Sequence, residues 1–160
     1  MKPIKTLAAI AISGVLATSA WAADYEVTRT LQLKHAKADV WRLIGGFCDV
    51  DNWHPEIARC DLKVIDGKLH RVLTTSGGSQ FVDQRIAKEQ GLSYTYGTSE
   101  GPLPAGNFIS TLSIEPIAPN GGARVTWSAN FSSDDPATEA KVIDLIEKGL
   151  AGIESSFRAE

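Results

Sequence analysis

Apolar and polar residues alternate along the first part of the chain. Over residues 25–33 this alternation has a period of two, which predicts a half-buried strand. Two short helical segments follow, over residues 39–44 and 47–53. Gly45 ends the first segment, and Pro55 ends the second because the residue before a proline avoids the helical region. The chain is therefore expected to open with one strand and a pair of short helices.

The middle of the chain is a series of strands separated by turn sequences. Asp66-Gly67, Gln90-Gly91 and Asn120-Gly121-Gly122 supply residues that adopt positive φ, which tight hairpins need. Strands joined by hairpins pair with their neighbours in sequence, so this region is predicted to form one antiparallel meander. Its six predicted strands cover residues 58–65, 69–75, 80–89, 92–99, 107–115 and 124–132.

A long helix ends the predicted pattern. Asp134 and Asp135 can cap it, and Pro136 suits its first position. Its apolar residues recur at three- and four-residue steps and form one stripe, made of Ile143, Ile146, Leu150, Ile153 and Phe157. Gly149 and Gly152 each cost about 1 kcal/mol relative to alanine inside a helix. Two explanations are open: either the sheet packs very close to the helix there, or the glycines leave room for a ligand.

One hydrophobic core is expected to join the helices to the sheet. Alternate residues of a strand share a face, and the apolar face must turn towards the core. The predicted core contains Trp41, Leu112, Trp127, Phe131, Ile146, Leu150 and Ile153.

Length and charge limit the classes of protein to which the chain can belong. Its 160 residues suit a single domain. It carries 16 Lys and Arg against 19 Asp and Glu, a formal net charge of −3, with no cluster of basic residues. A nucleic-acid groove needs clustered positive charge, and so does an anionic membrane surface. Neither nucleic acid nor such a membrane is expected as a partner.

Residues 1–22 are predicted to be a signal peptide. A basic start at Lys2 and Lys5 precedes an apolar stretch that ends in Ala20-Trp21-Ala22, the small-residue pattern of a cleavage site. The apolar stretch is about 14 residues long, short of the roughly 20 that a membrane span needs. We therefore expect an exported, periplasmic protein without stable membrane insertion, whose residues 24–160 form one domain.

The two cysteines, Cys48 and Cys60, have three possible states. Export favours a disulfide, which would stabilise the fold by roughly 3 kcal/mol in the chain-entropy account. Two free thiols are the second state. The third is a metal site that includes His54, although the spacing matches no standard zinc pattern. The disulfide is the favoured prediction, with no metal and no catalytic thiol.

The order of elements and several motifs resemble a known superfamily. The motifs are Val40-Trp41-x-Leu43-Ile44-Gly45-Gly46-Phe47-Cys48, Trp53-His54-Pro55 with Cys60, Gly101-Pro102-Leu103-Pro104 and Trp127-Ser128-Ala129-Asn130-Phe131. They are similar to those of the SRPBCC (START/pollen-allergen-like) superfamily, in its polyketide cyclase/dehydrase and lipid-transport branch. Exported members of that branch include an accessory protein of periplasmic methanol oxidation, which is kept as a candidate relative.

The resemblance implies an α+β helix-grip fold. In that fold an antiparallel seven-stranded sheet curls around the long C-terminal helix, and two short helices follow the first strand. Sheet and helix enclose an apolar cavity that holds a hydrophobic small molecule.

Candidate cavity residues combine aromatic walls with a few polar groups, as ligand sites do. They are Trp53, His54, Arg71, Gln84, Tyr94, Tyr96, Phe108, Trp127 and Gly149, and residues 101–106 are expected to form a lid. Other roles stay open. The tyrosines can belong to the core, His54 can orient a turn, and the facing of Arg71 and Gln84 is not settled by the pattern.

Common enzyme motifs are missing from the sequence, which contains no G-x-S-x-G, H-E-x-x-H, P-loop or G-x-G-x-x-G. No catalytic residue, metal or cofactor is predicted. The leading functional hypothesis is an exported protein that binds a lipid- or polyketide-like molecule. The alternatives are an accessory protein that assists a periplasmic redox enzyme and, less favoured, a cyclase or dehydratase acting in the cavity.

Overall fold

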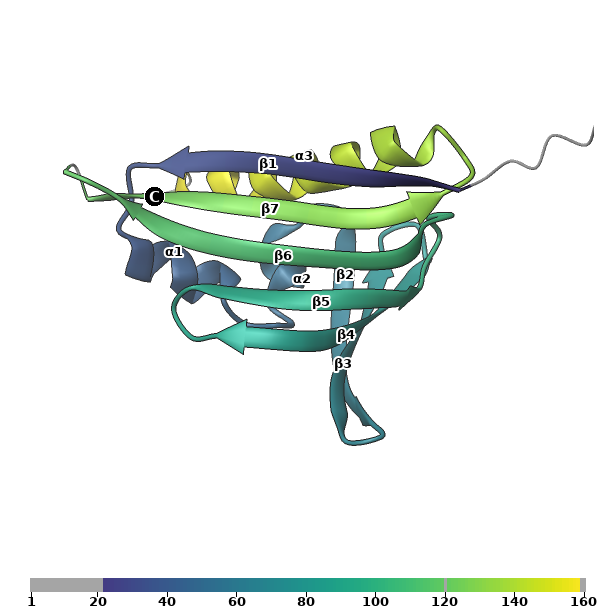
Figure 1. The fold of residues 1–160 in the computed structure, drawn as a ribbon. Coiled ribbons are helices and arrows are strands. Elements are labelled where there is room, and N and C mark those ends of the chain that lie inside the picture. Colours follow the sequence, from purple (N-terminus) through teal and green to yellow (C-terminus); the bar gives the residue numbers. More distant parts are fainter. Residues whose placement is uncertain (1–21, 120, 159–160) are drawn as a thin grey trace, which may run out of the picture.

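Residues 22–119 and 121–158 are described by a computed structural model (Figure 1). Residues 1–21, which hold nearly all of the predicted signal peptide, lie outside the described residues. In chain order the elements are β1 (Ala23–Leu33), α1 (Lys37–Ile44), α2 (Val50–Trp53), β2 (Ile57–Ile65), β3 (Lys68–Thr75), β4 (Gln80–Glu89), β5 (Ser93–Glu100), β6 (Gly106–Ile117), β7 (Gly122–Ser133) and α3 (Thr138–Arg158).

The strands form one antiparallel sheet with the order β1-β7-β6-β5-β4-β3-β2. β2 to β7 follow one another as a meander, and β1 pairs with β7 from Ala23 opposite Ser133 to Leu33 opposite Ala123. Gly67, Gly91 and Gly121 adopt positive φ in the tight turns. The predicted α+β helix-grip fold is confirmed.

Three helix boundaries differ from the prediction, and the first is α1, which begins at Lys37 instead of Asp39. The second helix covers only α2, because the residues before it form turns in which the Asp49 N–H donates to the Gly46 carbonyl. α3 begins at Thr138, with Pro136 in the preceding turn. Asp135 still caps this end, since its Oδ1 accepts a hydrogen bond of 2.9 Å from the Ala137 N–H.

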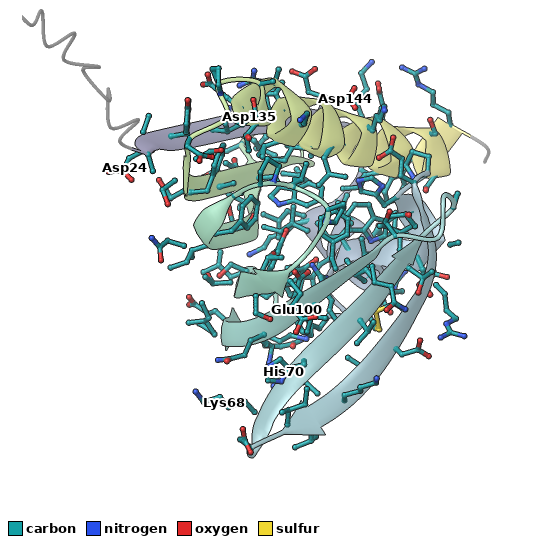
Figure 2. The ribbon with its side chains drawn as sticks, turned by 90° about the vertical axis from the view of Figure 1, so that its right-hand side faces the viewer. Asp24, Lys68, His70, Glu100, Asp135 and Asp144 are labelled. Carbon is teal, nitrogen blue, oxygen red and sulfur yellow. A yellow bond between two sulfur atoms is a disulfide. The ribbon has the colours of Figure 1, made fainter. Side chains whose placement is uncertain are left out.

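α3 packs along β1 on the inner side of the curved sheet, and side chains fill the space between them (Figures 1 and 2). All seven predicted core residues belong to one buried cluster. The buried stripe of α3 includes Val142, whereas the predicted Ile143 is only partly buried. The stripe is therefore rotated slightly from the predicted one.

A disulfide joins Cys48, in the turn before α2, to Cys60 of β2, with 5.5 Å between their Cα atoms. The disulfide prediction is confirmed, and the free-thiol and metal alternatives are wrong because both sulfur atoms are bonded to each other. The bond ties the helical segment to β2, the strand at one edge of the sheet.

Reduction of this disulfide is expected to lower stability by about 3 kcal/mol, because the unfolded chain regains the entropy of a closed loop. For a chain of this size the melting temperature should fall by roughly 6–12 °C. Thermal unfolding with and without reductant measures the change. The double variant Cys48→Ala/Cys60→Ala is the control and should not respond to reductant. Two alkylatable thiols in unreduced protein would contradict the prediction.

Candidate functional site

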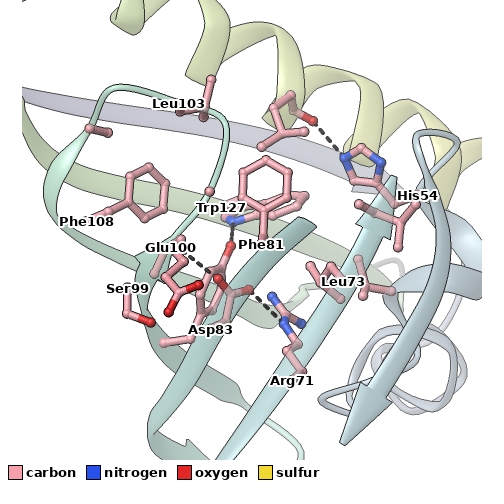
Figure 3. Close-up of a pocket in the computed structure, with 17 residues that line it drawn as sticks. His54, Arg71, Leu73, Phe81, Asp83, Ser99, Glu100, Leu103, Phe108 and Trp127 are labelled. Atoms are coloured by element: carbon pink, nitrogen blue, oxygen red, sulfur yellow. Dashed lines mark hydrogen bonds and ion pairs between the residues drawn. The ribbon is translucent and has the colours of Figure 1, made fainter. Parts of the chain in front are cut away.

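A cavity of about 390 Å³ lies between the inner face of the sheet and α3 (Figure 3). Small-molecule sites span about 300–1,000 Å³, so its size suits a small ligand. Most of the lining is apolar, and its largest apolar side chains are Ile57, Leu73, Phe81, Leu103, Phe108, Trp127 and Leu145. The cavity is therefore a largely apolar container at the small end of the usual range.

Strand alternation brings the walls of the cavity together. Leu73 of β3 and Phe81 of β4 stand directly opposite each other in the antiparallel register. Phe108 of β6 and Trp127 of β7 are buried on the same inner face. The loop after β5 contributes Gly101, Leu103 and Ala105, and Leu103 lies on the side of the cavity that faces α3 (Figure 3).

A row of polar residues crosses this apolar lining. Arg71 of β3 is opposite Asp83 of β4, and Asp83 is opposite Thr98 of β5. The Arg71 Nε donates to Asp83 Oδ2 at 2.9 Å, and the Thr98 hydroxyl donates to Asp83 Oδ1 at 2.6 Å. The side chains of Arg71 and Asp83 are 2% and 3% exposed, so this is a fully buried ion pair.

Arg71 is held on several sides by its surroundings. Its Nη1 donates to the Phe47 carbonyl at 2.7 Å. The rings of Phe47 and Tyr96 both lie 4.5 Å from Arg71 Cζ, a cation–π distance. Burial disfavours the charged form, but Asp83, Tyr94 and Tyr96 together outweigh burial and raise the pKa of Arg71. The guanidinium therefore remains charged.

Tyr96 and Trp127 share a hydrogen-bond network at the cavity wall. The Trp127 Nε1 donates to Ser110 Oγ at 2.9 Å and to Tyr96 Oη at 3.3 Å. Ser110 in turn donates to the Ser128 carbonyl at 2.7 Å. Burial raises the pKa of Tyr96 to about 12, so its hydroxyl stays protonated near neutral pH.

His54 uses both ring nitrogens within the fold. Its Nε2 lies 3.0 Å from the Leu145 carbonyl, which can only accept, so Nε2 carries the proton. Nδ1 accepts a hydrogen bond of 3.2 Å from the Glu56 N–H. Burial lowers the pKa of His54 and keeps the ring neutral. His54 therefore lines the cavity and also ties α3 to the segment that leads into β2.

Gly149 and Gly152 lie where α3 crosses the Trp53-His54-Pro55 segment. A Cβ at Gly149 would lie 2.5 Å from Trp127 Cζ3 and 2.8 Å from His54 Cδ2. A Cβ at Gly152 would lie 1.9 Å from the Trp53 carbonyl oxygen. All three distances are too short for any real Cβ contact. Close packing accounts for both glycines.

Five of the nine candidate residues line the cavity, namely His54, Arg71, Tyr96, Phe108 and Trp127. The other four do not. Trp53 and Tyr94 are buried behind the lining, with Trp53 stacked edge-on against Trp127 at 5.7 Å between ring centroids. Gln84 follows Asp83 and so points to the other face of β4. Gly149 contacts the rings of His54 and Trp127 instead.

Phe81, Asp83 and Thr98 also line the cavity and were missed as candidates. The sequence does contain a pattern that predicts Asp83. In a regular strand, Asp83 shares a face with the apolar Phe81, which places both on the side of the core. A buried arginine also needs an acidic partner on a neighbouring strand, which favours the same inward position for Asp83.

The chain matches a known protein family over nearly all of its described residues. The model of the family described as polyketide cyclase/dehydrase and lipid transport matches residues 24–158. The chain belongs to this family. It is thereby a member of the SRPBCC superfamily, as the sequence motifs indicated. A relation to the methanol-oxidation accessory protein stays a prediction.

Solved structures with the same fold support the assignment. The protein XoxI from Bacillus cereus is 25% identical, with a TM-score of 0.73 over 82% of this chain and 94% of its own. An uncharacterised protein from Bacillus thuringiensis is 24% identical, with a TM-score of 0.76 over 83% and 98%. The Zhui aromatase/cyclase from a Streptomyces species shares the fold at 13% identity, with a TM-score of 0.68 over 86% and 97%.

Comparison with curated proteins gives no match. None of the helices in residues 22–119 and 121–158 is both long and apolar enough to span a membrane.

Gly149→Ala is expected to destabilise the protein by about 1–3 kcal/mol, because the added methyl group overpacks the contact with Trp127 and His54. Because the added Cβ would meet two buried rings, the overpacking cost is expected at the upper end of this range, above the gain of about 1 kcal/mol in helix propensity. Urea unfolding measures the difference. Ser155→Ala, at an exposed position of the same helix, is the matched control and should not destabilise. A Gly149→Ala protein as stable as wild type would show that the helix is not held close at this point.

Stability should fall as the pH drops below about 6.5, because the folded state resists protonation of His54 while the unfolded chain does not. The contribution of the neutral ring is present above pH 6.5 and is lost progressively below it. Urea unfolding at pH 7.5 and pH 5 measures this effect. His54→Gln keeps a donor for the Leu145 carbonyl but cannot titrate. The variant should lose less stability than wild type between the two pH values, and an equal loss would contradict the assignment.

Proposed function

We propose that this protein binds an apolar small molecule in the cavity between the sheet and α3. The observation that carries the proposal is an apolar cavity of about 390 Å³ with one polar row across it. Ligand sites have this composition, because apolar walls supply affinity and a few fixed polar groups orient the ligand. Membership of the family described as polyketide cyclase/dehydrase and lipid transport supports either a ligand-binding or a cyclase role.

Binding receives more support than cyclisation from the groups around the cavity. A general acid or base must be free to reach the proton that it transfers. His54 has both ring nitrogens occupied by hydrogen bonds within the fold, so it is not free to transfer a proton. The likeness to the Zhui aromatase/cyclase reaches 13% identity, which is evidence of a shared fold alone. An accessory role beside a periplasmic redox enzyme stays a prediction.

The loop of residues 101–105 is the proposed route for the ligand. It follows β5 and lines the cavity through Gly101, Leu103 and Ala105. A second hollow, of about 420 Å³, lies on its other side, against the turn between β3 and β4 and the first half of α3. Phe81, Leu103 and Leu145 border both spaces. Movement of Leu103 would connect the two hollows and admit a ligand from outside.

An oxidising compartment is the proposed location of the protein. Disulfides persist in the periplasm and outside the cell but are rare in the cytosol, so the Cys48–Cys60 bond supports export. The signal-peptide pattern of residues 1–22 supports it independently. N-terminal sequencing of the secreted protein would test the expected cut after Ala22.

The variant Ala105→Phe tests the binding site. The new ring would fill part of the cavity, so the affinity for the neutral fluorescent probe N-phenyl-1-naphthylamine should fall at least about tenfold. The emission of the probe in a titration reports binding. Ala87→Phe adds the same ring at an exposed position of β4 and should leave binding unchanged. Circular dichroism checks that both variants fold.

Native mass spectrometry of freshly purified protein complements this titration, because a tightly held apolar ligand stays bound through purification. A folded wild-type protein that neither carries a ligand nor binds the probe would overturn the proposed function. Equal binding by Ala105→Phe and wild type would exclude this cavity as the site.

A further inference from the structure

Negatively charged side chains outnumber positively charged ones in the lining of the cavity. Among the described lining residues, Arg71 is the one side chain that carries a positive charge, since His54 is held neutral. Two carboxylates line the same space, Asp83 inside and Glu100 at its exposed edge. A ligand that enters the cavity therefore meets more negative than positive charge.

The positive charge of Arg71 is already paired with Asp83 within the fold. Asp83 takes its Nε, the Phe47 carbonyl takes a hydrogen bond from Nη1, and the rings of Phe47 and Tyr96 lie against the guanidinium. A carboxylate ligand would lose its hydration on entry. It would gain no unpaired cation in return and would lie close to Asp83. Burying a charge without a partner is strongly unfavourable.

Asp83 can accept more hydrogen bonds than it receives within the fold. An ionised carboxylate offers about four acceptor positions on its two oxygens. The Arg71 Nε occupies a position on Oδ2, and the Thr98 hydroxyl occupies a position on Oδ1. Asp83 also lines the cavity, as do the rings of Phe81 and Trp127 (Figure 3). A ligand with an O–H or N–H group near these rings can donate to it.

We propose that the ligand is an uncharged, ring-containing molecule with a hydroxyl or N–H group that donates to Asp83, and that the Arg71–Asp83 pair excludes carboxylate ligands such as fatty-acid anions. This inference rests on the proposed binding function and adds the charge class and the polar contact of the ligand. It makes Asp83 the residue that determines specificity.

Three probes built on the same naphthalene ring test the inference at pH 7.5. The amide 2-naphthamide is neutral and has a donor, methyl 2-naphthoate is neutral without a donor, and 2-naphthoate is an anion of similar shape. Isothermal titration calorimetry on the purified protein compares their affinities. The amide should bind about tenfold more tightly than the ester, as expected for a hydrogen bond to a charged acceptor. The carboxylate should bind at least about a hundredfold more weakly than the amide.

Two variants link this selectivity to the charges of the cavity. Asp83→Asn removes the partner of Arg71, so the preference should reverse and 2-naphthoate should bind more tightly than 2-naphthamide. Because a buried unpaired arginine can prevent folding, Glu100→Gln provides a second variant at an exposed position. It should improve 2-naphthoate binding about twofold to threefold relative to the amide. Glu89→Gln, at the exposed end of β4, is its matched control and should change neither affinity.

The possible failures are distinguishable. If neither the amide nor the ester binds, the proposed function fails and this inference fails with it. If all three probes bind and 2-naphthoate equals 2-naphthamide, the binding function stands and the exclusion of anions is overturned. If the amide binds no more tightly than the ester, the donor contact to Asp83 is overturned.

Discussion

The close approach of α3 to the Trp53-His54-Pro55 segment is the constraint on which the rest of the structure depends. At Gly152 the helix backbone comes so near to the Trp53 carbonyl that no side chain fits between them. The hydrogen bond from His54 to the Leu145 carbonyl holds the preceding turns in place. Leu145 therefore becomes a wall of the cavity instead of filling it. One contact fixes both where the helix touches the rest of the fold and where it leaves a gap.

The buried ion pair fits a role in recognition better than a role in stability. Replacing such a pair by apolar residues of similar volume is often neutral or stabilising, because desolvation offsets the attraction between the charges. Removing one partner alone costs about 3–5 kcal/mol. Arg71 and Asp83 occupy facing positions on β3 and β4. We interpret their presence as an adaptation to what the cavity holds.

Much of the fold could be predicted because it depends on local patterns. Turn sequences such as Asp66-Gly67 separate the strands, and the apolar stripe of α3 has a helical period whatever lies opposite. The facing of Arg71 could not be read so simply, because its strand has no clean alternation. The pairing of β4 with β5 also shifts register after Val82 and again after Arg85. The role of Gly149 depends on Trp127 and His54, which are both far from it in the sequence. No local sequence pattern therefore reveals that role.

The disulfide is linked to the polar row of the cavity through one residue, Phe47. Phe47, whose carbonyl and ring hold Arg71, directly precedes Cys48 in the turn that the bond to Cys60 secures. Loss of that covalent tie would loosen the turn that positions the arginine. Under the proposed function, oxidation of the two thiols would be coupled to ligand recognition through the peptide unit between Phe47 and Cys48. If the proposed binding function and export hold, a chain that reaches an oxidising compartment would acquire its cross-link and its selectivity in the same step.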